Sequence, residues 1–162
     1  MTPALEVRLA SPADARAIAL MSHELIEHGL PWTWRRERVA LAIAVAHTNV
    51  AVVGRPGAPA AFGIMEIWDD DAHLVLFAVR PALQRRGIGS ALLRWLEASA
   101  QVAGSRRIRV EARRDNDAAR CFYNEHGYHE RLLQRRMYSG AADGIRLEKW
   151  LRAENADEAG AV

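Results

Sequence analysis

The sequence predicts an α/β (α+β) domain with a mixed, mostly antiparallel central sheet of about seven strands and four helices. Short apolar or alternating runs, typical of strands, recur along the chain between stretches whose apolar residues follow helical spacing. Glycine, proline and aspartate clusters separate these runs. Hydrophobic residues make up 50% of the chain and charged residues 26%, an ordinary globular composition.

Residues typical of helix ends set the limits of the expected helices. Ser11 and Pro12 are typical of a helix start, and Gly29 of a helix end. Gly104 and Gly127 end two later helices. In chain order we expect a strand over 5–10, helices over 13–28 and 36–46, strands over 49–53, 60–68 and 73–79, a helix over 88–103, a strand over 107–112, a helix over 116–126, and strands over 131–138 and 145–151. Strands four and five should be parallel, because the long helix connects them.

The bulk properties favour one cytoplasmic domain over 1–152, followed by a flexible polar tail over 153–162. No apolar run approaches the roughly 20 residues that cross a bilayer. The single cysteine, Cys121, excludes an internal disulfide; it is expected to be a buried helix residue. The six histidines show no metal-ligand spacing, so no metal is expected.

Positive charge is concentrated in residues 80–120, which hold ten arginines against four carboxylates. A local basic region favours an anionic ligand. Nucleic acid and a phosphorylated cofactor both fit this charge, as does a solvated arginine-rich surface.

The central motif is the turn from Gln84 to Ser90, which joins an apolar strand to a long helix. First-turn amides of a helix lack intrahelical partners, and the helix dipole adds positive charge there. Gly87 and Gly89 let a phosphate approach these amides closely, while Arg85 and Arg86 add full charge. The turn lacks the lysine of a P-loop and the third glycine of a dinucleotide fingerprint. These features indicate a pyrophosphate cradle.

The segment Gln84-Arg85-Arg86-Gly87-Ile88-Gly89 resembles the Gln/Arg-x-x-Gly-x-Gly/Ala signature of the GNAT superfamily of N-acetyltransferases. The likeness in element order covers the whole chain and is strongest over 73–128. It implies acetyl-CoA as cofactor, with strands four and five splayed apart. The cofactor contacts it implies in this region are Phe77, Ala78, Val79, Gln84, Arg85, Arg86, Gly87, Ile88, Gly89 and Ser90, with the Val79 amide directed at the thioester carbonyl.

A second motif follows, with Asn116, Ala119 and Tyr123 on one helix face and Phe122 beside them. The GNAT resemblance recurs here, and implies that Asn116, Ala119 and Phe122 lie along the cofactor arm and that Tyr123 lies by its sulfur. A phenol there can donate a proton to the departing thiolate. A core aromatic is the alternative interpretation of Tyr123.

The acceptor amine must lose a proton before it attacks. Glu111 and Glu66 are the candidate bases on strands near the cofactor motif. The spacing of twelve residues between Glu111 and Tyr123 resembles the branch of the family that acetylates protein N-termini. Glu66 is the second choice.

Aromatic residues at breaks and strand ends are candidates for binding the acceptor: Trp32, Trp34, Trp68 and Tyr138. Packing alone also explains any one of them. The acceptor is a small amine or a peptide N-terminus; Trp34 and Met137 depart from the N-terminal acetyltransferase pattern.

The predicted function is transfer of an acetyl group from acetyl-CoA to a primary amine by direct attack in a ternary complex. A protein N-terminal acetyltransferase of the ribosomal-protein type and a non-catalytic CoA-binding module are the alternatives. No nucleic acid or membrane partner is expected, and a homodimer is possible. The acceptor, the base, the oligomeric state and the use of other acyl groups stay open.

Overall fold

The computed structural model describes residues 6–138 and 142–151, except the side chains of 133–138 and 142. The tail over 153–162 lies outside the described residues. Within them, no helix combines the length and the apolar character needed to span a membrane. The elements are β1 (Val7–Leu9), α1 (Ala15–Met21), α2 (Arg36–Ala44), β2 (Thr48–Arg55), β3 (Ala58–Trp68), β4 (Asp71–Val79), α3 (Ile88–Val102), β5 (Arg107–Arg113), α4 (Asp117–Glu125), β6 (His129–Tyr138) and β7 (Ala142–Trp150).

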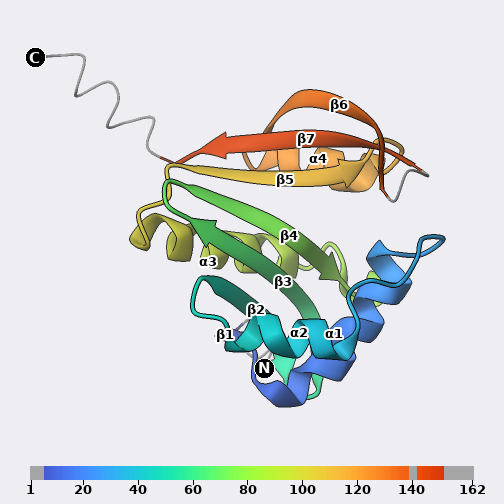
Figure 1. The fold of residues 1–162 in the computed structure, drawn as a ribbon, viewed down its shortest axis with the longest axis vertical. Coiled ribbons are helices and arrows are strands. Elements are labelled where there is room, and N and C mark those ends of the chain that lie inside the picture. Colours follow the sequence, from blue (N-terminus) through green and yellow to red (C-terminus); the bar gives the residue numbers. More distant parts are fainter. Residues whose placement is uncertain (1–5, 139–141, 152–162) are drawn as a thin grey trace, which may run out of the picture. The chain divides into compact units, whose positions relative to one another are not determined.

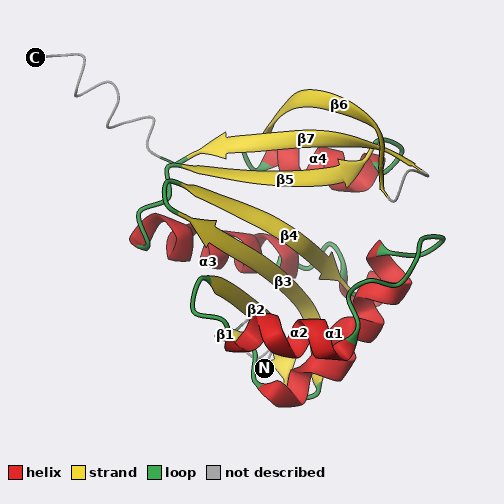
Figure 2. Cartoon of the chain, in the orientation of Figure 1, coloured by secondary structure: helices red, strands yellow, loops and turns green. Residues whose placement is uncertain are grey.

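The predicted fold class is confirmed: the described part of the chain has seven strands in the sheet order β1-β2-β3-β4-β5-β7-β6 and four α-helices (Figures 1 and 2). β4 and β5 are the parallel pair, and the printed registers of β1–β2, β2–β3, β5–β7 and β6–β7 are antiparallel. The chain divides into two compact units, one of residues 1–66 and 74–98 and the other of residues 67–73 and 99–162. The boundary crosses β4 between His73 and Leu74.

The first helical segment differs from the single helix expected over 13–28. A 3₁₀ turn, Pro12–Asp14, precedes α1, and a π-helical turn, Ser22–Ile26, follows it. In that turn the Glu27 amide donates to the Ser22 carbonyl at 2.7 Å. The wider turn brings the buried Glu27 carboxylate within 2.9 Å of the Ser22 hydroxyl. The hydrogen bonding of the buried Glu27 carboxylate thus accompanies a local departure from the regular α-helix that the apolar spacing predicts.

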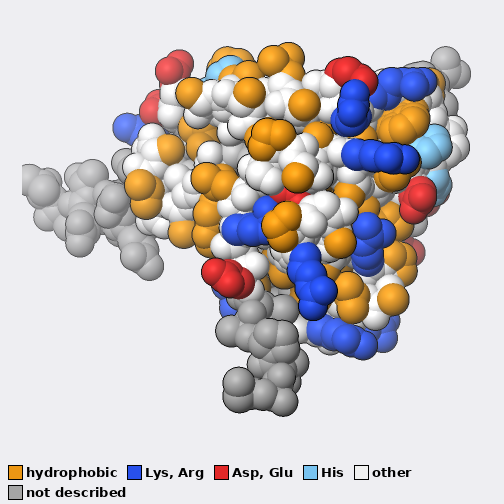
Figure 3. Space-filling view, turned by 90° about the horizontal axis from the view of Figure 1, so that it is seen from below, with side chains coloured by type: hydrophobic (Ala, Val, Ile, Leu, Met, Phe, Trp, Pro, Cys, Tyr) orange, Lys and Arg blue, Asp and Glu red, His pale blue; other side chains and the backbone are white. Residues whose placement is uncertain are grey.

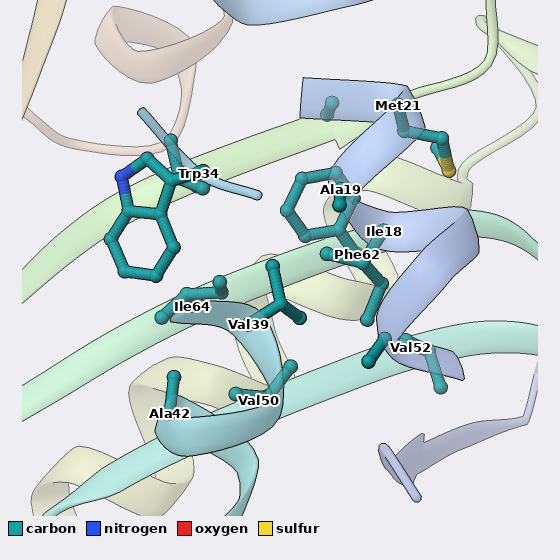
Figure 4. Packing of buried hydrophobic residues seen from close by; sticks show 13 residues of the cluster. Ile18, Ala19, Met21, Trp34, Val39, Ala42, Val50, Val52, Phe62 and Ile64 are labelled. Carbon is teal, nitrogen blue, oxygen red and sulfur yellow. The ribbon is translucent and has the colours of Figure 1, made fainter. Parts of the chain in front are cut away.

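The core of the first unit forms where α1 and α2 pack on one face of β2, β3 and β4 (Figure 4). Ile18 and Val39 from the helices meet Phe62 and Ile64 from β3, and all four are fully buried. Because side chains alternate along a strand, Gly63 points to the opposite face. A Cβ there would lie 2.6 Å from the Leu96 Cδ1 of α3, so glycine is needed for α3 to pack this closely.

The second unit is organised by β5, whose residues alternate between buried and half-buried. Ile108, Val110 and Ala112 are buried, so the polar residues of the strand share the other face. Glu111 on that face is paired in register with Arg146 of β7. The strand register therefore sets a carboxylate and a guanidinium side by side.

A buried ion pair joins β1 to the start of α1. Arg8 donates to both carboxylate oxygens of Asp14, at 2.8 and 3.0 Å, and the Asp14 side chain is fully buried. The amides of Ser11 and Gly57 also donate to Asp14, each at 2.9 Å. The hydrogen bond from Arg8 is the largest influence on the Asp14 pKa and, with those from the amides, lowers it far below its usual range, against the opposing effect of burial.

We expect Asp14→Asn to lower the free energy of unfolding at pH 7 by about 3 kcal/mol, because it breaks a buried ion pair. A carboxylate with a depressed folded pKa stabilises the fold above its unfolded pKa, about 3.9, and this contribution is lost as the pH falls. The gap between wild type and variant should therefore shrink by about 1 kcal/mol at pH 3. Urea denaturation at both pH values measures it, with Asp70→Asn, an exposed site, as the control. A gap that does not depend on pH would contradict this assignment.

Candidate active site

The predicted anion cradle is an exposed turn in the first unit. After β4 a short 3₁₀ turn, Pro81–Leu83, leads to the exposed residues 84–87, and α3 begins at Ile88. Arg85 and Gly87 adopt left-handed backbone conformations, with φ of 64° and 78°. Alternation of left- and right-handed residues is typical of backbone concavities in which successive amides bind an anion.

Charge and space in this turn both suit a diphosphate. The amides of Ile88 and Gly89 are in the first turn of α3, where no i−4 carbonyl is available within the helix. The side chains of Arg85 and Arg86 are exposed beside them. A Cβ built on Gly87 would meet nothing within 4 Å, so this glycine is required by its backbone conformation and not by crowding.

The residues before the turn occupy the last part of β4. Ala78 packs into the core, while Phe77 and Val79 are half-buried. The Gln84 side-chain amide donates to the Val79 carbonyl at 3.2 Å, which ties the turn to the strand end. The Arg80 amide donates to the Ala60 carbonyl of β3 at 2.9 Å. The strand end is therefore held by β3 and by the turn that follows it.

The second motif forms a capped helix in the other unit. The Asn116 side chain accepts a hydrogen bond from the Ala119 amide at 3.1 Å, so Asn116 is the N-cap of α4, as its position predicts. Tyr123 is buried, with its ring centroid 5.4 Å from that of Phe122 and 5.6 Å from that of Tyr128. These contacts hold the Tyr123 ring in one orientation, which suits either a core aromatic or a positioned acid.

Glu111 lies in a cluster of charged partners within the same unit. Its Oε2 is 2.5 Å from the Nε2 of His73 on β4, and its Oε1 is 3.6 Å from the Nε of Arg146 on β7. The side chains of His73 and Glu111 are 26% and 18% exposed, so the pair is partly shielded from water. A histidine and an arginine of different strands thus flank one carboxylate.

This environment lowers the pKa of Glu111. Burial is the largest single influence and acts to raise it, but the hydrogen bond from His73 and the charges of His73, Arg146 and Arg109 together outweigh burial. The net direction is below the ordinary value for glutamate. Glu111 is consequently an ionised carboxylate at neutral pH.

Glu66, the second candidate base, lies in the other unit. It is near the end of β3, half-buried, and paired in register with Thr48 of β2. Glu111 and Tyr123 thus belong to one unit and Glu66 to another.

The predicted acceptor residues have different surroundings. Trp34 is only 7% exposed and packs in the core of the first unit, under the Arg38 guanidinium at 3.8 Å from its ring centroid. Trp32 is half-buried; its indole N–H donates to the Trp34 carbonyl at 3.1 Å, and its ring lies 4.6 Å from that of His23. Trp68, at the end of β3, is 51% exposed. The Tyr138 side chain lies outside the described part of the structure.

A buried carboxylate holds the segment that carries the two tryptophans. Glu27 accepts hydrogen bonds from the Thr33 amide at 2.8 Å, the Thr33 hydroxyl at 2.6 Å and the Trp34 amide at 3.3 Å. Burial acts most strongly on the Glu27 pKa and raises it, but these hydrogen bonds together lower it below the ordinary value. Glu27 thus fixes the backbone at residues 33 and 34.

The sequence did not lead us to predict three residues that hold these groups in place: His73, Arg146 and Glu27. A histidine at the start of an apolar strand, together with the expected parallel pairing of strands four and five, was a usable signal for His73. The link to Arg146 needs the β5–β7 register, which the sequence does not show. Glu27 was hidden inside what looked like a regular helix.

One further expectation concerns a surface group. Cys121 was expected to be buried but is exposed, because it faces outward on α4 within 3.5 Å of Glu125. The hydrogen bond from its thiol to the Glu125 carboxylate raises the thiol pKa, which disfavours a nucleophilic thiolate. On the face shown in Figure 3, Lys and Arg side chains lie scattered among hydrophobic ones.

Known proteins similar to this chain are acetyltransferases. The "[Ribosomal protein bS18]-alanine N-acetyltransferase" of Escherichia coli strain K12 is 37% identical over 121 residues, which cover 73% of this chain and 80% of that protein. The crystal structure of the ribosomal-protein-S18-alanine N-acetyltransferase from Escherichia coli is 27% identical, with a TM-score of 0.74, and the match covers 90% of this chain and 93% of that one. The structure of yncA from Salmonella typhimurium with its cofactor acetyl-CoA is 19% identical, with a TM-score of 0.75 over 93% and 95% of the two chains.

Residues 17–128 match the model of the Acetyltransferase (GNAT) family. The resemblance, the acyltransferase activity and the expected cofactor are thereby confirmed, since GNAT acetyltransferases use acetyl-CoA. The chain belongs to the Acetyltransferase (GNAT) family.

Proposed function

We propose that this protein acetylates the α-amino group of a protein N-terminus, with acetyl-CoA as donor and by direct attack in a ternary complex. The observation that carries the proposal is the 37% identity to the bS18-alanine N-acetyltransferase over 80% of that enzyme. The spacing of twelve residues between Glu111 and Tyr123 supports it. By the same likeness, alanine is the proposed N-terminal residue of the acceptor.

Each residue group has one role in this proposal. The turn over 84–90 holds the pyrophosphate, and the strand end over 77–79 pairs with the pantetheine arm. The Val79 amide stabilises the oxyanion that forms on the thioester carbonyl. Asn116, Ala119 and Phe122 lie along the cofactor arm.

Proton transfer accompanies bond making and bond breaking. Tyr123 donates a proton to the thiolate as it leaves. The Glu111 cluster receives the proton of the incoming ammonium group; we prefer it to Glu66 because the cluster belongs to the same unit as Tyr123. Trp32, Trp68 and Tyr138 remain the proposed acceptor contacts, whereas Trp34 supports them from the core.

A peptide panel tests the acceptor. We expect the protein to acetylate a peptide with a free N-terminal alanine. Release of the CoA thiol and mass spectrometry of the peptide measure the reaction. The same peptide with a blocked N-terminus and an internal lysine should not react, and spermidine should react at least 10-fold more slowly. Preferred acetylation of spermidine would contradict the proposed acceptor. CoA binding without transfer to any amine would favour the non-catalytic module.

Tyr123→Phe removes the proposed acid and keeps the ring that packs on Phe122 and Tyr128. We expect kcat to fall by about 10²-fold or more while the Kd for CoA changes less than twofold. Steady-state kinetics and calorimetry measure the two effects. Tyr128→Phe, which changes the neighbouring ring and leaves the Tyr123 hydroxyl in place, is the comparison. A wild-type kcat in Tyr123→Phe would exclude the acid role.

Gly87→Ala tests the cradle. The substitution forces a residue with a Cβ into a left-handed conformation, which costs about 1–2 kcal/mol and should distort the anion-binding turn. We expect the Kd for CoA to rise by about 10-fold. Gly104→Ala is a matched control, because Gly104 also has a positive φ and open space around it but follows the far end of α3. Equal effects of the two substitutions on CoA affinity would argue against the cradle.

A further inference from the structure

His73 is a titratable residue in an otherwise apolar stretch of β4, over 72–79. Its Nε2 lies 2.5 Å from the Oε2 of Glu111, 38 residues further along the chain. Both residues belong to the same unit, so the contact does not depend on how the two units are placed. A partly shielded imidazole beside a carboxylate is an arrangement that can move protons.

Proton positions in this pair follow from simple chemistry. An ionised carboxylate can only accept hydrogen bonds, so the Nε2 of His73 must carry the proton between the two groups. In the neutral imidazole the lone pair is then on Nδ1. Within the described residues Nδ1 has no hydrogen-bond partner, and the His73 side chain keeps 26% of its surface exposed. Nδ1 is therefore available to accept a proton.

Glu111 by itself is poorly suited to take a proton from an ammonium group. A general base works best when its pKa lies near the working pH. Burial acts most strongly on Glu111 and raises its pKa, but the hydrogen bond from His73 and the nearby charges outweigh burial and move the pKa in the opposite direction. The imidazole of His73 has a second ring nitrogen, Nδ1, which does not take part in the contact with Glu111. Besides His73, the charged groups that act on Glu111 are Arg146 of β7 and Arg109 of β5, and Arg109 also acts on Asp71 of β4.

We propose that Nδ1 of His73 is the proton acceptor of the acetyl transfer and that Glu111 orients its ring through Nε2. The inference rests on the proposed function, and divides the base role assigned there to the Glu111 cluster between two residues. Glu111 becomes a positioning residue that selects the tautomer and stabilises the imidazolium, as a carboxylate does for histidine in hydrolase triads.

The step balances as follows. The ammonium nitrogen gives one proton to Nδ1 of His73, and the freed lone pair forms the C–N bond with the thioester carbon. Collapse of the oxyanion breaks the C–S bond, and Tyr123 protonates the departing sulfur. The second proton of the nitrogen restores Tyr123, and the imidazolium of His73 releases its proton to solvent. The products are the acetylated amine, free coenzyme A and one proton.

Single-turnover rates with a saturating alanine peptide, measured from pH 5.5 to 9, test the proposal. We expect His73→Gln to lower the rate by about 10²-fold and to remove one ionisation from the acidic limb of the profile. The ionisation of the peptide amine itself persists in the variant, so the difference between the profiles isolates the imidazole. His129→Gln, an exposed histidine of β6, is the control and should keep the wild-type profile.

The outcomes separate this inference from the proposed function. Loss of transfer in Glu111→Gln with a wild-type profile in His73→Gln would overturn the His73 role and leave the proposed function standing. Wild-type rates in both variants would overturn the base assignment as a whole, while acetylation of the alanine peptide would still support the acceptor.

Nuclear magnetic resonance tests the proposed tautomer of His73 in the wild-type protein, so this measurement does not depend on whether a variant folds. In ¹⁵N-labelled wild-type protein, the His73 ring should carry its proton on Nε2 when neutral, with Nδ1 unprotonated. Assignment of this signal uses His73→Gln or, if that variant does not fold, through-bond correlation in the wild type. A neutral ring protonated on Nδ1 would overturn the proposal.

Discussion

The backbone conformation at Arg85 and Gly87 is the constraint on which the proposed chemistry depends. If β4 ran directly into α3, the preceding chain would cover the first amides of the helix, and an anion could not reach them. Two left-handed residues turn the chain so that residues 84–87 are exposed and α3 starts immediately after them. The buried leucines of α3 then anchor the helix in the core, so an anion bound at its start meets a rigid array of dipoles.

Local signals predicted this part of the molecule well. The two glycines, the arginines and the periodic helix that follows all lie within twenty residues, and α3 begins at Ile88 as expected. The N-cap Asn116 is local in the same sense. The His73–Glu111 contact is not, because it depends on which strands become neighbours and in which register. Tertiary structure decides which polar side chains of neighbouring strands form a pair. A single sequence shows only that polar and apolar residues alternate along each strand.

The same distinction explains the first helical segment. Apolar spacing over 13–28 fits a helix, and most of the segment is helical. The π-helical turn is linked to the hydrogen bonds of Glu27, which the spacing of apolar residues does not reveal. Glu27 is buried and must be satisfied, and its partners at Thr33 and Trp34 lie beyond the helix. A buried carboxylate with fixed partners also makes the following backbone rigid. From the sequence, Trp32 and Trp34 were expected at a break or a strand end, and the pattern gave no sign that Glu27 holds them.

That rigidity bears on how an acceptor could be selected. Trp34 fills the core and is covered by Arg38, so substitutions there should act mainly through packing. Trp32 is half-buried, and its indole N–H donates to the Trp34 carbonyl. Its ring also contacts the His23 ring and the Arg35 guanidinium, so only part of the ring surface is left for an acceptor. Glu27 keeps this segment in one shape through its hydrogen bonds to Thr33 and Trp34, while the Ser22 hydroxyl donates to the same carboxylate from the preceding turn. The proposed acceptor, with its small first residue, would suit a preformed surface of this kind, because a fixed backbone can exclude larger side chains without moving.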